Sequence, residues 1–265
     1  MKNILLLVHS GHGQEARIEV ALDVVRAIGG HLTCLDVTVY PAMAGDYGDS
    51  SAILYTDECV REAKNKLSLE PRLLAEGVSW DWIDARGPLD LSLIKASGLA
   101  DLIILNTMLD ETGSSNMRGV VGEVLLRGHR PILAVPDTAT ALSLSGHAVI
   151  AWDGSDAAID ALRASVPLLR LAMIVTILEI KDGSVDTPAE DAATYLSRYG
   201  ISATVRAPHA LLDDAATIIL REVGLLDPDY LVMGGFGHSR MREALFGGVT
   251  RRLLSESSIP LLLAH

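Results

Sequence analysis

The sequence has few cysteines and few aromatic residues, and these shortages narrow the class of protein. Two of its 265 residues are cysteine, Cys34 and Cys59, and their spacing matches no metal-binding or redox motif. Aromatic residues make up 4% of the chain, whereas hydrophobic residues make up 49%. The apolar content is therefore mainly Val, Ile, Leu and Ala, which is typical of parallel strands covered by helices on both faces.

Long hydrophobic runs and excess positive charge are also missing. The longest apolar runs, such as residues 4–8 and 102–105, are far shorter than the roughly 20 residues of a membrane-spanning helix. The first residues, MKNILLLVHSGHG, lack a signal-peptide cleavage region and suggest a first strand. The net charge is −12, with acidic residues in excess in both halves. We therefore expect a cytoplasmic protein that binds neither nucleic acid nor a membrane.

The sequence contains an internal repeat. NILLLVHSG (3–11) resembles HAVIAWDGS (147–155), and the ends of the two halves match as well. Asp101 and Pro131 are 30 positions apart in the first half, and Asp229 and Pro260 are 31 apart in the second. Small, polar residues separate the halves at 137–146 and are typical of a linker. We predict two domains, residues 1–138 and 145–265.

Strand-like and helix-like segments alternate within each half. This alternation predicts an α/β fold, with two tandem, doubly wound, Rossmann-like domains built on parallel sheets. The segments expected in the first half are strands at 3–8, 31–38, 78–84, 101–106 and 131–135, and helices at 14–28, 52–76, 89–98 and 119–128. Ligands of such folds bind beyond the carboxyl ends of the strands, where the strand order reverses.

A glycine-rich stretch, MGGFGHSRMREALFGGVT (233–250), follows the strand expected at 230–233. Glycine lets the backbone approach a ligand closely, and the helix expected after Gly248 would offer its N-terminal N–H groups to a phosphate. Residues 234–252 contain four arginines and one glutamate, whereas residues 106–130 of the first half contain three basic and three acidic residues. The second half therefore has the better phosphate-binding composition.

The spacing Gly234-x2-Gly237-x9-Gly247 resembles the nucleotide loop of the universal stress protein family, including the His-Ser-Arg after the second glycine. The resemblance extends over the whole chain as a tandem pair with a degenerate first copy. It implies a flavodoxin-like five-stranded sheet in the order 3-2-1-4-5 in each domain. It also implies that the last strands, 131–135 and 260–264, pair within one chain around a pseudo-twofold axis, with homodimerisation as a further option.

The resemblance also implies the ligand and its contacts. The ligand would be ATP, or alternatively ADP or AMP, with Mg²⁺ as a companion of ATP. Asp153 would meet the nucleoside, Ile180 would lie against the adenine, and backbone N–H groups of 234–238 and 247–250 would hold the phosphates. The implied nucleotide-binding residues are Asp153, Ile180, Met233, Gly234, Gly237, His238, Ser239, Gly247, Gly248, Val249 and Thr250.

Two departures from the family pattern affect this expectation. Gly248 stands where most members have Ser or Thr, so a hydroxyl that contacts phosphate is lost, and Val249 and Thr250 replace it only in part. In the first half, Ser10 lies near the position of Asp153, so the acid is missing there. We therefore expect one nucleotide site, in the second domain.

Weaker signals remain open. Gly11-x-Gly13-x-x-Ala16 has the outline of a dinucleotide fingerprint, but the second half has no such glycines. His9 and His12 resemble a metal pair, although no neighbouring Cys, Asp or Glu completes a ligand set, so we predict no metal site on the protein itself. The Gly- and Asp-rich segment 40–57 suggests an exposed loop, and Trp80 and Trp82 suggest core packing or a domain contact.

The pattern favours a nucleotide-dependent stress-response or regulatory protein over an enzyme. The sequence has no G-x4-G-K-[ST] loop, no G-x-S-x-G elbow and no evident general base, so at most slow ATP hydrolysis is expected. Two alternatives stay open. One is an interaction module that binds no nucleotide, and the other is an enzyme of a related adenine-nucleotide fold.

Overall fold

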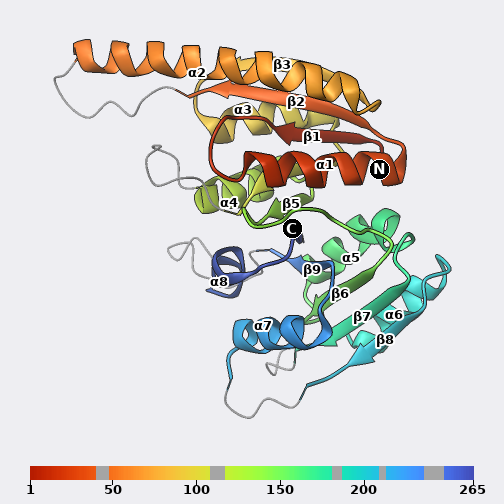
Figure 1. Ribbon diagram of the computed structural model, residues 1–265. Helices are drawn as coiled ribbons and strands as arrows, with labels where there is room; N and C mark the ends of the chain where they lie inside the picture. The colour runs from red at the N-terminus through yellow and green to blue at the C-terminus, as the bar shows by residue number, and fades with distance from the viewer. Residues whose placement is uncertain (40–47, 108–116, 181–186, 209–212, 236–247) are drawn as a thin grey trace.

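The computed structural model describes residues 1–39, 48–107, 117–180, 187–208, 213–235 and 248–265. Within these residues the chain forms one ten-stranded sheet in the order β3-β2-β1-β4-β5-β10-β9-β6-β7-β8. The first domain occupies the upper half of Figure 1 and the second domain the lower half. Each domain has its five strands in the order 3-2-1-4-5, which confirms the expected doubly wound fold.

The strands of the first domain agree closely with the segments expected from the sequence. Those of the first domain are β1 (Asn3–Leu7), β2 (His31–Thr38), β3 (Ser79–Arg86), β4 (Leu102–Asn106) and β5 (Ile132–Val135). Those of the second domain are β6 (His147–Trp152), β7 (Ile174–Glu179), β8 (Ala203–Arg206), β9 (Tyr230–Gly234) and β10 (Leu261–Ala264).

Helices lie on both faces of the sheet (Figure 1). Those of the first domain are α1 (Gln14–Ile28), α2 (Gly48–Ala75), α3 (Leu89–Ala96), the 3-10 helix η1 (Ser97–Leu99) and α4 (Met117–Gly128). Those of the second domain are α5 (Asp156–Leu169), α6 (Ala189–Ser197), α7 (Ala215–Leu226) and α8 (Gly248–Glu256). No helix among the described residues is both long enough and apolar enough to cross a membrane.

The expected loop at 40–57 is partly wrong. Residues 48–57 form the first turns of α2, which confirms the helix expected from residue 52 and starts it four residues earlier, whereas residues 40–47 lie outside the described part of the chain. The composition misled the prediction because Asp and Ser, which are frequent in loops, are also favoured at the start of a helix.

The two domains join through their last strands. β5 and β10 pair antiparallel, with Leu261 opposite Ala134 and Leu263 opposite Ile132. The other strand pairs, within each domain, are parallel. This arrangement confirms the intramolecular pairing that the resemblance implies, and it leaves neither strand at an open edge of the sheet.

The hydrophobic core continues from one domain into the other on both faces of the sheet. Successive side chains of a strand point to opposite faces, so Leu133 and Leu262 join one buried cluster, while Ala134 and Leu261 join the other. Trp80 and Trp82 pack, partly buried, against the first cluster, which confirms core packing for these residues.

Candidate functional site

The strand order of the second domain reverses between β6 and β9. The structure brings Asp153, which follows β6, and Gly234, which ends β9, to the carboxyl edge of these two strands. Ile180 follows the next strand, β7, and its N–H donates to the carbonyl of Trp152 at 2.8 Å. These three predicted residues therefore flank the point at which ligands of doubly wound folds bind.

Asp153 is held in one orientation by the turn that leads into α5. Its Oδ1 accepts hydrogen bonds from the Ser155 N–H at 3.0 Å and from the Ser155 Oγ at 2.7 Å. Gly154 has φ 76°, which favours glycine, and lets the chain turn between the two residues. Ser155 also caps α5, because its Oγ accepts from the Ala158 N–H at 3.2 Å. Sequence reasoning missed Ser155, although the Asp-Gly-Ser pattern is a recognisable turn-and-cap signal.

Gly234 sits against the first turn of α5. A Cβ at this position would lie 2.7 Å from the backbone carbon of Ala157 and from the nitrogen of Ala158. Next to it, a Cβ on Gly235 would lie 2.5 Å from a methyl group of Leu125 in α4 of the first domain. The glycine-rich stretch therefore starts in a tight passage between α5 and the partner domain, which side chains would obstruct.

The other predicted residues differ in their burial, and some of them lie outside the described part of the chain. Met233 and Ile180 are buried, each 5% exposed, and Val249 is half-buried in α8. Thr250 is 4% exposed, whereas a Cβ added to Gly248 at the start of α8 would meet no atom of the described residues within 4 Å. Gly237, His238, Ser239 and Gly247 lie outside the described residues. Because Thr250 is buried, it is poorly suited to replace the hydroxyl that Gly248 lacks.

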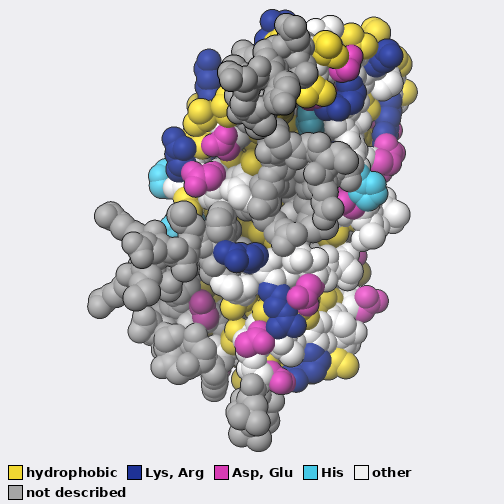
Figure 2. Space-filling view, turned by 90° about the vertical axis from the view of Figure 1, so that its left-hand side faces the viewer, with side chains coloured by type: hydrophobic (Ala, Val, Ile, Leu, Met, Phe, Trp, Pro, Cys, Tyr) yellow, Lys and Arg dark blue, Asp and Glu magenta, His cyan; other side chains and the backbone are white. Residues whose placement is uncertain are grey.

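The positive charge counted in the sequence is partly neutralised in the structure. Arg252 Nη1 lies 3.1 Å from Asp214 Oδ2, and its Nε lies 3.0 Å from Glu256 Oε1. On the face turned toward the viewer in Figure 2, basic and acidic side chains intermingle over the described surface. Simple charge counting therefore overstated how much positive charge α8 offers to a phosphate.

The strand register identifies the equivalent residues of the first domain. Asn3 pairs with His31 as His147 pairs with Ile174, so His9 and Asp153, each six positions further, are equivalent. His9, rather than Ser10, thus takes the place of the acid. Ser10 instead donates from its N–H and Oγ to the carboxylate of Glu62, at 3.1 and 2.8 Å.

The equivalent of Gly234 in the first domain is Asn106, and buried polar side chains fill the space around it. Asn106 accepts a hydrogen bond from Arg17 and donates to Asp137 Oδ1 at 3.1 Å. Arg17 is 0% exposed and also donates to the carbonyl of His9 at 2.8 Å. Burial lowers the pKa of Arg17 to about 10, while the carboxylates of Asp137 and Glu62 act in the opposite direction.

Asp137 also occupies the N-terminus of α1. Gly13, the residue before this helix, has φ 76°, and a Cβ on it would collide with the Asp137 carboxylate. His12 Nδ1 lies 2.8 Å from the other oxygen of this carboxylate. The first domain therefore places its own anion where the dinucleotide fingerprint at Gly11 and Gly13 would bind a phosphate. His9 and His12 face different carboxylates and do not form the metal pair considered from the sequence.

Comparisons with known proteins agree with this architecture. Residues 145–265 match the model of the universal stress protein family. A universal stress protein from Archaeoglobus fulgidus DSM 4304 has 18% identity, covers 98% of this chain and 95% of its own, and superposes with a TM-score of 0.72. A protein of unknown function from Pseudomonas aeruginosa PAO1 has 16% identity, covers 100% of this chain and 92% of its own, and has a TM-score of 0.62. No curated protein sequence matches this chain. At these identities the solved structures show that the fold, including the tandem arrangement, is shared.

Proposed function

Because residues 145–265 match the model of the universal stress protein family, we propose that this part of the chain binds one adenine nucleotide, with ATP as the first candidate. The proposal rests on two features that lie together where the strand order reverses. The carboxylate of Asp153 is oriented by its turn, and the strand end at Gly234 has no room for a side chain. The carboxylate suits the ribose hydroxyls of a nucleoside, and the glycine suits a closely approaching phosphate chain.

The first domain is proposed to bind no nucleotide. Arg17 and Asn106 fill the space beside the end of β4, and Asp137 presents a carboxylate to the N-terminus of α1. A phosphate would meet a like charge there and would have to displace buried hydrogen bonds. The proposed stoichiometry is therefore one nucleotide per chain, and Mg²⁺ would enter with ATP.

The proposed role is regulatory: a cytoplasmic protein whose nucleotide state alters its part in a stress response. The proposed role of the Asp153 carboxylate is to orient the nucleoside, with its Oδ1 held by Ser155, so we propose no general base for fast hydrolysis. Slow hydrolysis is compatible with this role because a regulatory switch needs a long-lived bound state.

Mass analysis of the nucleotide released on denaturing the purified protein, followed by titration calorimetry with ATP, tests the proposal. We expect one adenine nucleotide per chain, and an affinity for ATP that falls about tenfold or more in Asp153→Asn, because a charge-assisted hydrogen bond is lost. Asp160→Asn is the matched control, since Asp160 lies on α5, is 51% exposed and pairs with Arg163.

Two nucleotides per chain would contradict the assignment of the first domain. If neither retained nucleotide nor binding at millimolar ATP is found, the proposal fails and the interaction module takes its place. Release of pyrophosphate or a flavin absorbance would instead support an enzyme of a related fold.

A further inference from the structure

We propose that the first domain holds a divalent transition-metal cation between His9, Glu58 and Glu62. This site lies at the carboxyl end of β1, at the position that Asp153 occupies in the second domain, and it is independent of the proposed nucleotide site. Each of the three side chains offers one ligand atom, and these atoms all lie within 4.8 Å of one another.

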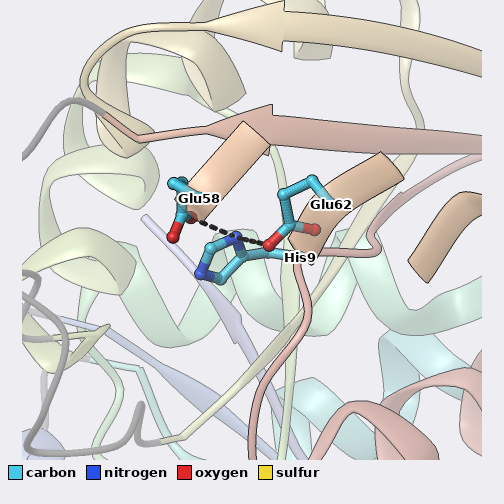
Figure 3. A group of neighbouring side chains, drawn as sticks. All are labelled: His9, Glu58 and Glu62. Atoms are coloured by element: carbon cyan, nitrogen blue, oxygen red, sulfur yellow. Dashed lines mark ion pairs between the residues drawn. The ribbon is translucent and has the colours of Figure 1, made fainter. Parts of the chain in front are cut away.

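The geometry requires little movement to become a coordination site. His9 Nδ1 lies 3.1 Å from Glu62 Oε1 and 3.8 Å from Glu58 Oε1. Two ligands about 2.1 Å from a tetrahedral metal ion are roughly 3.4 Å apart, so both separations are close to those of a bound state. The imidazole points to the space between the two carboxylates (Figure 3).

The sequence builds this arrangement from two distant segments. Glu58 and Glu62 are four positions apart on α2 and so lie on the same face of the helix, on successive turns. His9 follows β1, and Asn65 ties α2 to this strand by donating to the Val8 carbonyl at 2.6 Å. Glu62 is fixed further by the N–H and hydroxyl of Ser10. Such supporting hydrogen bonds orient metal ligands.

Burial leaves two of the ligand atoms without a well-directed hydrogen bond. His9 Nδ1 and Glu58 Oε1 are inaccessible to solvent, and within the described part of the chain they make ion-pair contacts but no well-directed hydrogen bond. The side chains of His9 and Glu58 are each 12% exposed and that of Glu62 is 3% exposed. Polar atoms left in this way cost free energy unless something else compensates them. A cation bound at the convergence of the three side chains would do so.

Neighbouring charges compete with the cation and provide a test. Arg61 forms an ion pair with Glu58, and its Nε lies 3.6 Å from Glu62 Oε1. Arg61 is 54% exposed, so its side chain can turn to solvent when a metal ion binds. Lys66 is engaged elsewhere, with Asp84 Oδ2 at 2.8 Å. Removing Arg61 should therefore strengthen metal binding, an effect that a purely structural role for the cluster would not produce.

The donor set indicates the class of metal. One imidazole nitrogen and two carboxylate oxygens suit Zn²⁺ and related divalent transition metals, which leave a fourth position for water. Mg²⁺ and Ca²⁺ prefer all-oxygen sites, so they should bind more weakly here.

The test is calorimetric titration of the chelator-treated full-length protein with zinc chloride, in a Cys59→Ser background that removes the thiol next to Glu58. We expect one Zn²⁺ per chain and a thermal stabilisation that depends on zinc concentration. His9→Gln and Glu58→Gln should each weaken binding by at least about tenfold, and Arg61→Gln should tighten it. His31→Gln is the matched control, because His31 lies 3.2 Å from Asp81 without a second carboxylate.

Failure of the parent protein to bind one Zn²⁺ would overturn the proposal. Equal losses of zinc affinity in His9→Gln and His31→Gln, or weaker zinc binding in Arg61→Gln, would also overturn it. The unfolding midpoint of each variant without metal separates a loss of ligand from a loss of fold, and Glu58→Gln repeats the test at a less buried position than Glu62. ATP titration in the same variants should be unchanged, which distinguishes this site from the nucleotide site.

Discussion

The two domains share one strand order but end their equivalent central strands in different ways. In the second domain β9 ends at Gly234, which approaches the backbone of α5 so closely that a Cβ does not fit. In the first domain β4 ends at Asn106, which is 0% exposed and bonded to Arg17 and Asp137. The comparison teaches that one position at a strand end separates an edge packed closely against helix backbone from an edge filled by buried polar side chains.

The same contrast appears at the neighbouring strand. Asp153 in the second domain accepts hydrogen bonds from Ser155 in its own turn, whereas His9 in the first domain faces two carboxylates from α2. The strands beneath are alike, because alternating aliphatic side chains serve both cores. Divergence is therefore concentrated where strands end and side chains no longer pack in the core.

The largest effect is expected from removing the buried arginine of the first domain. Arg17→Met leaves the Asn106 and His9 oxygens without a donor, and we expect the free energy of unfolding to fall by roughly 2–5 kcal/mol. Urea unfolding followed by tryptophan fluorescence measures this change. Arg163→Met, at a side chain that is 62% exposed, should have almost no effect. Equal losses in both variants would show that the buried network does not stabilise the first domain.

A smaller loss is expected from filling the tight passage in the second domain. Gly234→Ala introduces a Cβ 2.7 Å from the α5 backbone, and we expect a destabilisation of about 1–3 kcal/mol together with weaker ATP binding. Gly248→Ala is the matched control for stability, since a Cβ there meets no atom of the described residues within 4 Å. Thermal unfolding of the two variants should differ clearly, and a harmless Gly234→Ala would refute the close approach.

The smallest change is a gain. Gly248→Ser adds the hydroxyl that the family resemblance places here, at a position where a Cβ meets no atom of the described residues within 4 Å. One added hydrogen bond to a phosphate should raise the affinity for ATP by about 2- to 10-fold, corresponding to 0.5–1.5 kcal/mol. Calorimetry measures the gain, with Gly248→Ala to separate the hydroxyl from the change in backbone freedom. An unchanged affinity in Gly248→Ser would place the phosphates elsewhere.

Much of the fold could be predicted from the sequence because the signal is local and repeated. The strands and helices of the first half, several of those of the second half, and the pairing of 131–135 with 260–264 follow from hydrophobic periodicity or from the family resemblance. The start of α2 was harder to predict, because residues 48–57 have the composition of a loop yet form a helix. Helix boundaries depend on capping and packing as well as on composition.

The candidate sites were less predictable because they combine distant segments. The sequence identified Asp153 and Gly234 through the spacing of a loop, but it did not identify Arg17 as the side chain that fills the first domain's edge. It also did not bring His9 together with Glu58 and Glu62, because these two residues lie about 50 positions away. The charge of Arg252 was counted toward a phosphate, although Asp214 and Glu256 pair with it.

The sequence by itself determined the duplicated α/β architecture, because hydrophobic periodicity and turn residues act over short stretches and were present twice. The tertiary structure alone decided which side chains meet at the carboxyl ends of the strands in each domain. The strand register made His9 the equivalent of Asp153 in the other domain. The packing of α1 buried Arg17 against Asn106, and the path of α2 brought two carboxylates to the imidazole of His9. Such contacts depend on where the sheet places segments far apart in the chain, and no local pattern records that.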